Sequence, residues 1–142
     1  MFLGVNRKYS KDIINTPFKE DYIKEGKSLI LKSSEVSLRQ ESAKTIMLKI
    51  EESNLQMAYS KTVAQAKTEF NGKEMNFYGL LKEMQDPDRE TRKEALKAWS
   101  DLYESISADL DKIYDKLIAN RVKQAKKLKY KDYVAQIYEA RS

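Results

Sequence analysis

The stretch Asp86–Leu117 reads DPDRETRKEALKAWSDLYESISADLDKIYDKL, and it decides the fold because it predicts a long helix. Asp86 can cap the helix, and Pro87 suits its first turn because no N–H is needed there. Asp88 and Glu90 place negative charge where the helix dipole favours it. We therefore expect a helix to begin at this point.

An apolar seam follows this helix start. Its members recur at alternating steps of three and four residues: Leu96, Trp99, Tyr103, Ile106, Leu110, Ile113 and Leu117. This spacing puts the side chains on one face of a helix, as in the narrow seam of a coiled coil. The apolar face drifts onward to Leu128, so we expect a helix of about 40 residues, roughly 60 Å long. A helix with such a seam needs partners to cover it.

The rest of the chain also predicts helices. Apolar residues from Leu48 to Phe70 recur in steps of four, three or seven, which predicts a second helix. Upstream apolar residues from Ala43 to Ile50 extend it to roughly 30 residues. A shorter helix is expected from about Lys19 to Leu31, and Asp132 can cap a last helical segment. Residues 1–18 show only a weak pattern.

One short β-hairpin interrupts the helices. Asn71-Gly72 lies between two stretches that could be extended, and Asn-Gly favours the type I′ turn of a hairpin. We predict this hairpin within residues 67–77. The chain has only 4 Gly and 2 Pro, too few for the turns of a large sheet. The sequence thus predicts a mainly α fold, an antiparallel bundle of long helices with one hairpin, over residues 1–142 as a single helical domain or fragment.

The composition excludes several kinds of site. The 142 residues include no His and no Cys, so imidazole bases, thiolate nucleophiles and the usual zinc ligands are missing. We predict no catalytic, cofactor-binding or metal-binding residue in this chain. No apolar run approaches the roughly 20 residues of a membrane span, and the apolar run at the N-terminus is too short to be a signal peptide. We expect a cytoplasmic protein without disulfides or membrane contact.

Other candidate motifs have ordinary explanations. The formal charge is +5, and the densest basic cluster comprises Lys123, Lys126, Lys127, Lys129 and Lys131. We interpret this cluster as a solvated helix end and do not expect nucleic-acid binding. The Tyr78/Lys82 spacing is attributed to chance, because no nucleotide-binding fingerprint accompanies it. The pairs Ser60-Lys61 and Ser10-Lys11 are attributed to chance as well, because adjacent residues in a helix do not face each other.

An ordered series of segments resembles a known family. Glu51–Glu74 is similar to a segment of the M3 family of zinc oligoendopeptidases, of the oligoendopeptidase F type. Asp88–Ala95 resembles that family's Asp-Arg-x-x-Arg-Lys-x-Ala helix start, and Leu110–Leu117 and Arg121–Tyr133 continue the series. Where the family typically has Leu-Gly-Tyr, this chain has Lys129 in place of the glycine. The resemblance covers about residues 50–140, and residues 15–50 match more loosely.

This resemblance implies a role without chemistry of its own. The family's zinc site is a His-Glu-x-x-His helix with a downstream glutamate, in a region that this chain does not contain. The resemblance therefore implies an internal, N-terminal-half helical fragment that lines the substrate channel and is inactive alone. The intact enzyme would use zinc to hydrolyse short peptides. The implied partners are the remainder of the peptidase or a second copy.

Two alternatives remain open at this stage. The first is a free-standing interaction module that self-associates through the Leu96–Leu117 seam. The second is a weak nucleic-acid binder that uses the Lys123–Lys131 cluster.

Overall fold

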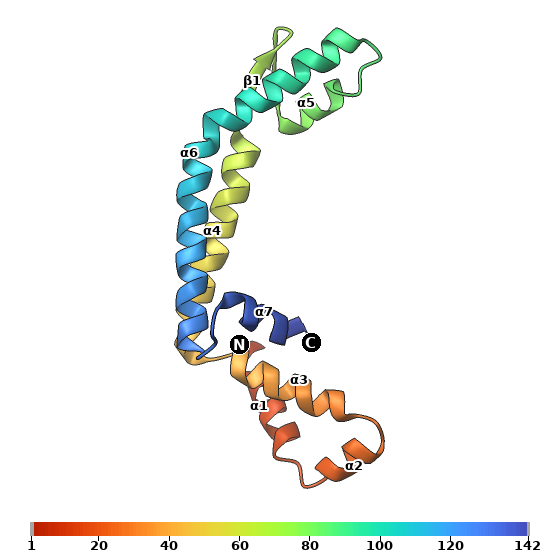
Figure 1. Ribbon diagram of the computed structural model, residues 1–142, viewed down its shortest axis with the longest axis vertical. Coiled ribbons are helices and arrows are strands. Elements are labelled where there is room, and N and C mark those ends of the chain that lie inside the picture. Colours follow the sequence, from red (N-terminus) through yellow and green to blue (C-terminus); the bar gives the residue numbers. More distant parts are fainter. Residues whose placement is uncertain (1, 142) are drawn as a thin grey trace. The chain divides into compact units, whose positions relative to one another are not determined.

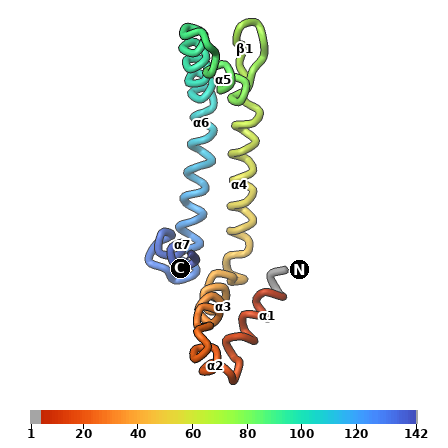
Figure 2. Tube along the Cα trace, turned by 90° about the vertical axis from the view of Figure 1, so that its right-hand side faces the viewer, coloured from red at the N-terminus to blue at the C-terminus, as the bar shows by residue number. Residues whose placement is uncertain are grey.

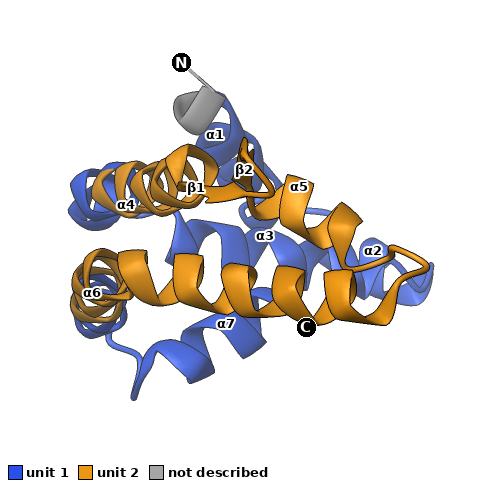
Figure 3. Cartoon of the chain, turned by 90° about the horizontal axis from the view of Figure 1, so that it is seen from above, with its two compact units in different colours: residues 1–50, 120–142 blue, residues 51–119 orange. Residues whose placement is uncertain are grey.

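The computed structural model describes residues 2–141 and is mainly α, as the sequence predicts (Figures 1 and 2). The described elements are, in order, α1 (Phe2–Ile14), α2 (Lys19–Lys24), α3 (Ser28–Gln40), the 3-10 helix η1 (Ala43–Thr45), α4 (Ile46–Gln65), β1 (Lys67–Phe70), β2 (Lys73–Asn76), α5 (Phe77–Glu83), α6 (Arg89–Lys127) and α7 (Tyr133–Arg141). The chain forms two compact units (Figure 3). We call residues 51–119 the hairpin unit, and residues up to 50 with those from 120 the terminal unit.

The start of α6 differs by two residues from the prediction. Asp88 caps the helix, because its Oδ2 accepts the backbone N–H of Thr91 at 2.8 Å. Asp86, which the sequence suggested as the cap, instead accepts the N–H of Asp88 at 2.8 Å and forms the turn before the helix. The Arg92 guanidinium locks this turn by donating to the carbonyl of Asp86 at 2.7 Å. Hydrogen bonds from Thr91 lower the pKa of Asp88.

α6 has 39 residues, which agrees with the expected length of about 40. At the N-terminal end of α6, however, the buried face differs from the predicted seam by one residue. Leu110 and Leu117 are buried, as the seam predicts. Ala95 and Leu102 are buried in place of Leu96 and Tyr103, which are exposed. Ala95 is the smaller residue, so it lets neighbouring elements approach the helix closely while the larger Leu96 turns outward.

The core of the hairpin unit explains this displacement. Its buried cluster consists of Ala66, Phe70, Leu80, Ala95 and Leu102. Half-buried side chains pack around the cluster: Met75, Phe77, Met84, Ala98, Trp99 and Ile106. The hairpin and α5 therefore pack on the Ala95–Leu102 side of α6 and determine which face is buried.

The predicted β-hairpin is confirmed. β1 and β2 pair antiparallel, with Lys67 opposite Asn76 and Phe70 opposite Lys73. The two turn residues, Asn71 and Gly72, have φ angles of 50° and 71°, as a type I′ turn requires. α5 follows directly, because Asn76 Oδ1 caps it by accepting the N–H of Gly79 at 3.0 Å.

The second long helix is shorter than predicted. α4 begins at Ile46 and ends at Gln65, and Ala66 and Phe70 join the hairpin core instead of continuing the helix. Within the hairpin unit, α4 runs beside α6 (Figure 2), and the hydroxyl oxygens of Tyr59 and Tyr103 are 3.4 Å apart. No side chain of α4 is fully buried between Ile46 and Gln65.

The N-terminal region contains more helix than the sequence suggested. α1 forms where the pattern was weak, and the expected helix from Lys19 to Leu31 is divided into α2 and α3. Gly26 causes this break, because it adopts a φ of 71°. The N–H of Gly26 then donates to Ile23 at 3.0 Å and that of Lys27 to Tyr22 at 2.7 Å, which is the Schellman pattern of a helix end.

The same pattern ends α6 without a glycine. Lys129 has a φ of 62°, its N–H donates to Lys126 O at 3.1 Å, and the N–H of Tyr130 donates to Ala125 O at 3.0 Å. The substitution of the glycine by Lys129 therefore keeps the left-handed helix end. Asp132 then caps α7, as predicted, by accepting the N–H of Ala135 at 2.8 Å.

We predict that Lys129→Gly stabilises the protein by about 1 kcal/mol, because a side chain in the left-handed region costs roughly that much. Urea unfolding measures the effect. Lys123→Gly, an exposed position inside α6, is the matched control and should lose about 1 kcal/mol. A Lys129→Gly variant that is less stable than the parent would contradict the left-handed helix end.

Candidate functional site

The chain lacks the residues of a zinc site. It has no His or Cys, and no group of three acidic side chains between residues 2 and 141 lies close enough together to hold a metal ion. These residues therefore do not fit a catalytic zinc, which needs several convergent ligands. The prediction that the chain has no catalytic or cofactor residue remains a prediction. In the same range, no helix combines the length and apolarity needed to cross a membrane.

The motifs singled out in the sequence do not form a site. Tyr78 is 82% exposed on α5, and Lys82 is exposed as well. Ser10 is buried whereas Lys11 is exposed, so the two side chains face different surroundings and do not form a Ser–Lys pair. The five lysines from Lys123 to Lys131 are all exposed at the end of α6 and in the loop after it. This placement agrees with their interpretation as a solvated helix end.

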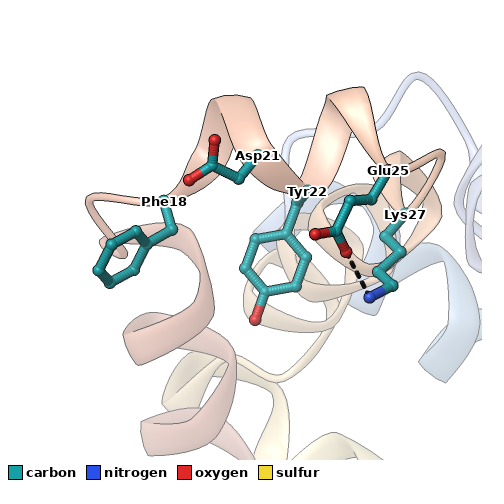
Figure 4. Close-up of a pocket in the computed structure, with 5 residues that line it drawn as sticks. All are labelled: Phe18, Asp21, Tyr22, Glu25 and Lys27. Atoms are coloured by element: carbon teal, nitrogen blue, oxygen red, sulfur yellow. Dashed lines mark hydrogen bonds and ion pairs between the residues drawn. The ribbon is translucent and has the colours of Figure 1, made fainter.

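A pocket of about 320 Å³ opens at α2 and the loop that follows (Figure 4). It is lined by Phe18, Asp21, Tyr22, Glu25 and Lys27. Lys27 Nζ lies 2.6 Å from Glu25 Oε2, and this contact lowers the pKa of Glu25 and raises that of Lys27. Because the ion pair is exposed, these groups keep the character of ordinary surface charges.

A polar network joins α3 to α7 within the terminal unit. We call Arg39, Gln40, Tyr130, Gln136 and Glu139 the polar latch. The Arg39 guanidinium lies over the Tyr130 ring at 4.0 Å and donates to Glu139 Oε1 at 2.8 Å. The Tyr130 hydroxyl also donates to the Glu139 carboxylate.

The two glutamines complete the latch. Gln40 Nε2 donates to the Tyr130 hydroxyl and to the backbone carbonyl of Gln136, each at 3.0 Å. Gln136 is buried and donates to Gln40 Oε1 at 3.2 Å. The latch residues of α3 lie 90 to 100 positions from those at and before α7 in the sequence, and they follow no apolar period, so no sequence pattern predicts their contact. The latch attaches α7 to α3.

The aromatic side chains of the hairpin unit form a second cluster. The ring centroids of Trp99 and Tyr103 are 5.4 Å apart and stacked, and Phe77 meets both rings edge-on at 5.7 and 5.6 Å. The hydrogen bond with Tyr103 raises the pKa of Tyr59. Most of this cluster packs at the edge of the core, which agrees with the structural role expected for the seam aromatics.

One face of α6 carries apolar side chains that remain exposed. We call it the apolar strip: Leu96, Tyr103, Tyr114 and Ile118, which are 58%, 38%, 55% and 45% exposed. The steps between them are 7, 11 and 4 residues, so they share one side of the helix. The strip lies beside the buried face and belongs entirely to the hairpin unit.

These features define a class of protein: a mainly α fold with two long helices connected through a hairpin and a short helix. Solved structures identify the class more closely. The chain is similar over 97% of its length to a protein from Bacillus anthracis str. Ames assigned as an oligoendopeptidase F, with 32% identity and a TM-score of 0.84. A second protein assigned as an oligoendopeptidase F matches with 25% identity, and PZ peptidase A, solved with an inhibitor, matches with 28%; both have TM-scores of 0.85.

These matches confirm the resemblance to the oligoendopeptidase F type of the M3 family. The chain has the fold of one part of such a peptidase. It spans 24–25% of the length of these three chains, although 97% of its own length is matched. No protein-family model matches the sequence, and no curated protein matches it either.

The polar latch predicts a fall in stability at high pH. Burial and the hydrogen bond to Glu139 raise the pKa of Tyr130 to about 12 from a usual value of 10.0. Unfolding releases a tyrosine that ionises at about 10, so the contribution of Tyr130 is fully present below pH 10 and is lost as the pH rises toward 12. Urea unfolding between pH 9 and 12 should show a smaller fall for Tyr130→Phe. Parallel curves for the two proteins would contradict this account.

Proposed function

We propose that this chain acts as a non-catalytic helical segment of an oligoendopeptidase F-type peptidase, over residues 1–142 as one domain or fragment, in the cytoplasm. It would form part of the wall of the channel that receives short peptides. The observation that carries this proposal is the match of 97% of this chain to only a quarter of each related chain.

The residue types of the chain support a non-catalytic role, with the zinc chemistry carried out by the rest of the enzyme. In the intact enzyme, a bound zinc ion would polarise the peptide carbonyl and supply an activated water. This chain has neither imidazole nor thiol, so in the proposed enzyme the zinc ligands would come from the remaining three quarters. The chain itself would contribute a rigid wall, because its long helices α4 and α6 would limit the width of the channel and so exclude folded proteins.

The surface of the chain supports the need for a partner. α4 has no fully buried side chain between Ile46 and Gln65, and its Met47, Ile50 and Met57 are at least half exposed. The apolar strip adds four more exposed apolar side chains on α6. Covering apolar surface gains about 25 cal/mol per Å², so docking onto the remainder of a peptidase would be favourable.

Self-association is the second candidate function. Leu96 and Tyr103 of the predicted seam are exposed and available to a second copy. Leu110 and Leu117 are already buried within the chain, which leaves only part of the Leu96–Leu117 seam for pairing. Light scattering after size-exclusion chromatography tests this candidate, because a monomer at high concentration would argue against it.

A complementation assay tests the leading proposal. The Bacillus anthracis protein would be prepared without its matched quarter, and this chain added in trans. We expect cleavage of an internally quenched peptide only when both pieces are present, and its loss with a zinc chelator. This chain alone, even with excess zinc, should show no cleavage.

The matched control for that assay is the relative's own quarter added in trans. If that quarter restores cleavage and this chain does not, the proposal fails. Zinc-dependent cleavage by this chain alone would also contradict it.

A further inference from the structure

The hairpin turn contains the one asparagine in the sequence that is followed by a glycine, Asn71-Gly72. Both residues are exposed at the tip of the hairpin (Figure 1). A Cβ built on Gly72 would have no neighbour within 4 Å, so this side of the turn is open to water. Among residues 2–141, no hydrogen bond engages the N–H of Gly72 or the side chain of Asn71. Both groups are therefore available to react with each other.

We propose that Asn71 is a site of spontaneous deamidation and that the hairpin turn controls its rate. The Gly72 nitrogen attacks the side-chain Cγ of Asn71, a C–N bond forms, and the proton of that nitrogen leaves with Nδ2 as ammonia. Water then adds to one of the two carbonyl carbons of the cyclic imide and breaks its bond to the Gly72 nitrogen. The product is aspartate or isoaspartate, and either one lowers the net charge of +5 by one. This inference does not depend on the proposed function.

The backbone of the observed turn holds the two reacting groups apart. Ring closure requires the Gly72 nitrogen to eclipse Cβ of Asn71, which for an L-residue occurs at a ψ of about −120°. The φ angles of 50° and 71° assign the turn to type I′. In this type the first central residue has a ψ of about +30°, which turns the carbonyl oxygen toward the side chain and the nitrogen away from it. The ring therefore cannot close in this conformation.

A flip of the peptide between Asn71 and Gly72 brings the two groups together. The flip converts type I′ into type II′, whose first central residue has a ψ of about −120°. Both turn types suit a hairpin, so the pairing of Phe70 with Lys73 can persist during the flip. Type II′ favours glycine at its first central position, so Asn71 is strained there. Strain of this kind reduces the population of the reactive conformer by about tenfold to hundredfold.

The two products affect the hairpin differently. Isoaspartate places the side-chain methylene of residue 71 in the main chain, which lengthens the turn by one atom and disrupts the type I′ geometry. Phe70, directly before the turn, is 7% exposed and belongs to the buried cluster with Leu80 and Ala95. The isoaspartyl form therefore packs this cluster less well. Asp-Gly also favours a type I′ turn, so the aspartyl form keeps the parent structure.

Peptide mapping of the aged full chain tests the proposal. The chain would be incubated at pH 8 and 37 °C, either folded or unfolded in guanidinium chloride, and then cleaved after lysine to release Thr68–Lys73. Mass spectrometry measures the conversion of amide to acid, and chromatography against synthetic standards separates the two products.

Two differences in rate are expected. In the unfolded chain, Asn71 should react about tenfold faster than the other asparagines, because glycine has no Cβ to hinder the attack. In the folded chain, Asn71 should react about tenfold to hundredfold more slowly than in the unfolded chain, because the turn must flip first.

Other asparagines serve as internal controls, and one variant serves as the matched control. Asn54 is exposed on α4 but is followed by Leu55, and the Asn76 side chain accepts the N–H of Gly79 at 3.0 Å. Both should remain amides in the folded chain while Asn71 converts. Asn71→Asp should show no mass change in this peptide and should unfold at the same urea concentration as the parent. The purified isoaspartyl form should unfold at a lower urea concentration.

Three results would overturn the proposal. The first is another asparagine that reacts before Asn71, or no conversion of Asn71 in the folded chain after about a hundred half-times of the unfolded chain. The second is an equal rate in the folded and unfolded chains, because the turn would then exert no control. The third is an isoaspartyl form as stable as the parent, because the turn would then not support the packing of Phe70.

Discussion

The constraint on which the structure depends is the burial of one apolar face along α6. Ala95 and Leu102 are covered by the hairpin and α5, and Leu110 and Leu117 are buried further along the helix. Each fully buried leucine gains about 1.5–3 kcal/mol relative to exposure, so this face supplies much of the stability of the hairpin unit. The adjacent face of the same helix, the apolar strip, stays exposed.

The two units are stabilised in different ways. Seven of the buried hydrophobic residues lie in the hairpin unit: Ala66, Phe70, Leu80, Ala95, Leu102, Leu110 and Leu117. Among the residues whose burial the structure describes, 5–141, the buried polar side chains lie in the terminal unit: Ser10, Ser34, Thr45, Asn120, Gln124 and Gln136. There, Asn120 Nδ2 donates to the Leu48 carbonyl at 3.0 Å, and Gln124 Nε2 donates to Asn120 Oδ1 at 2.8 Å.

This difference has an energetic consequence. A hydrogen bond contributes only about 0.5–1.5 kcal/mol net, so a unit held mainly by polar contacts gains less from folding than one with an apolar core. Buried polar groups also require their partners, since leaving one unpaired costs about 1–3 kcal/mol. The terminal unit should therefore be the less stable of the two and the more dependent on a docking partner.

The sequence predicts those features that depend on residues close together in the chain, such as turns and helix caps. The sequence predicts the hairpin because Asn71-Gly72 can adopt the two positive φ angles of a type I′ turn, which few other residue pairs tolerate. It also predicts Asp132 as a helix cap, because an aspartate side chain can accept a backbone N–H of the first helical turn. The sequence does not predict which face of α6 is buried at its N-terminal end, because Ala95 and Leu96 both fit an apolar period. Only the packing of the hairpin and α5 determines that Ala95 is the buried residue. The polar latch was not readable either, because Arg39 and Glu139 are brought together by tertiary structure alone.

The heat capacity change of unfolding tests the central claim most directly, because it reports how much apolar surface the chain buries. A compact protein of 142 residues has a value of about 1.7–2.1 kcal/mol/K, from 12–15 cal/mol/K per residue. Differential scanning calorimetry of the isolated chain should give a value clearly below this range. A value within the range or above it would show that the chain covers its own apolar faces, and would contradict the account.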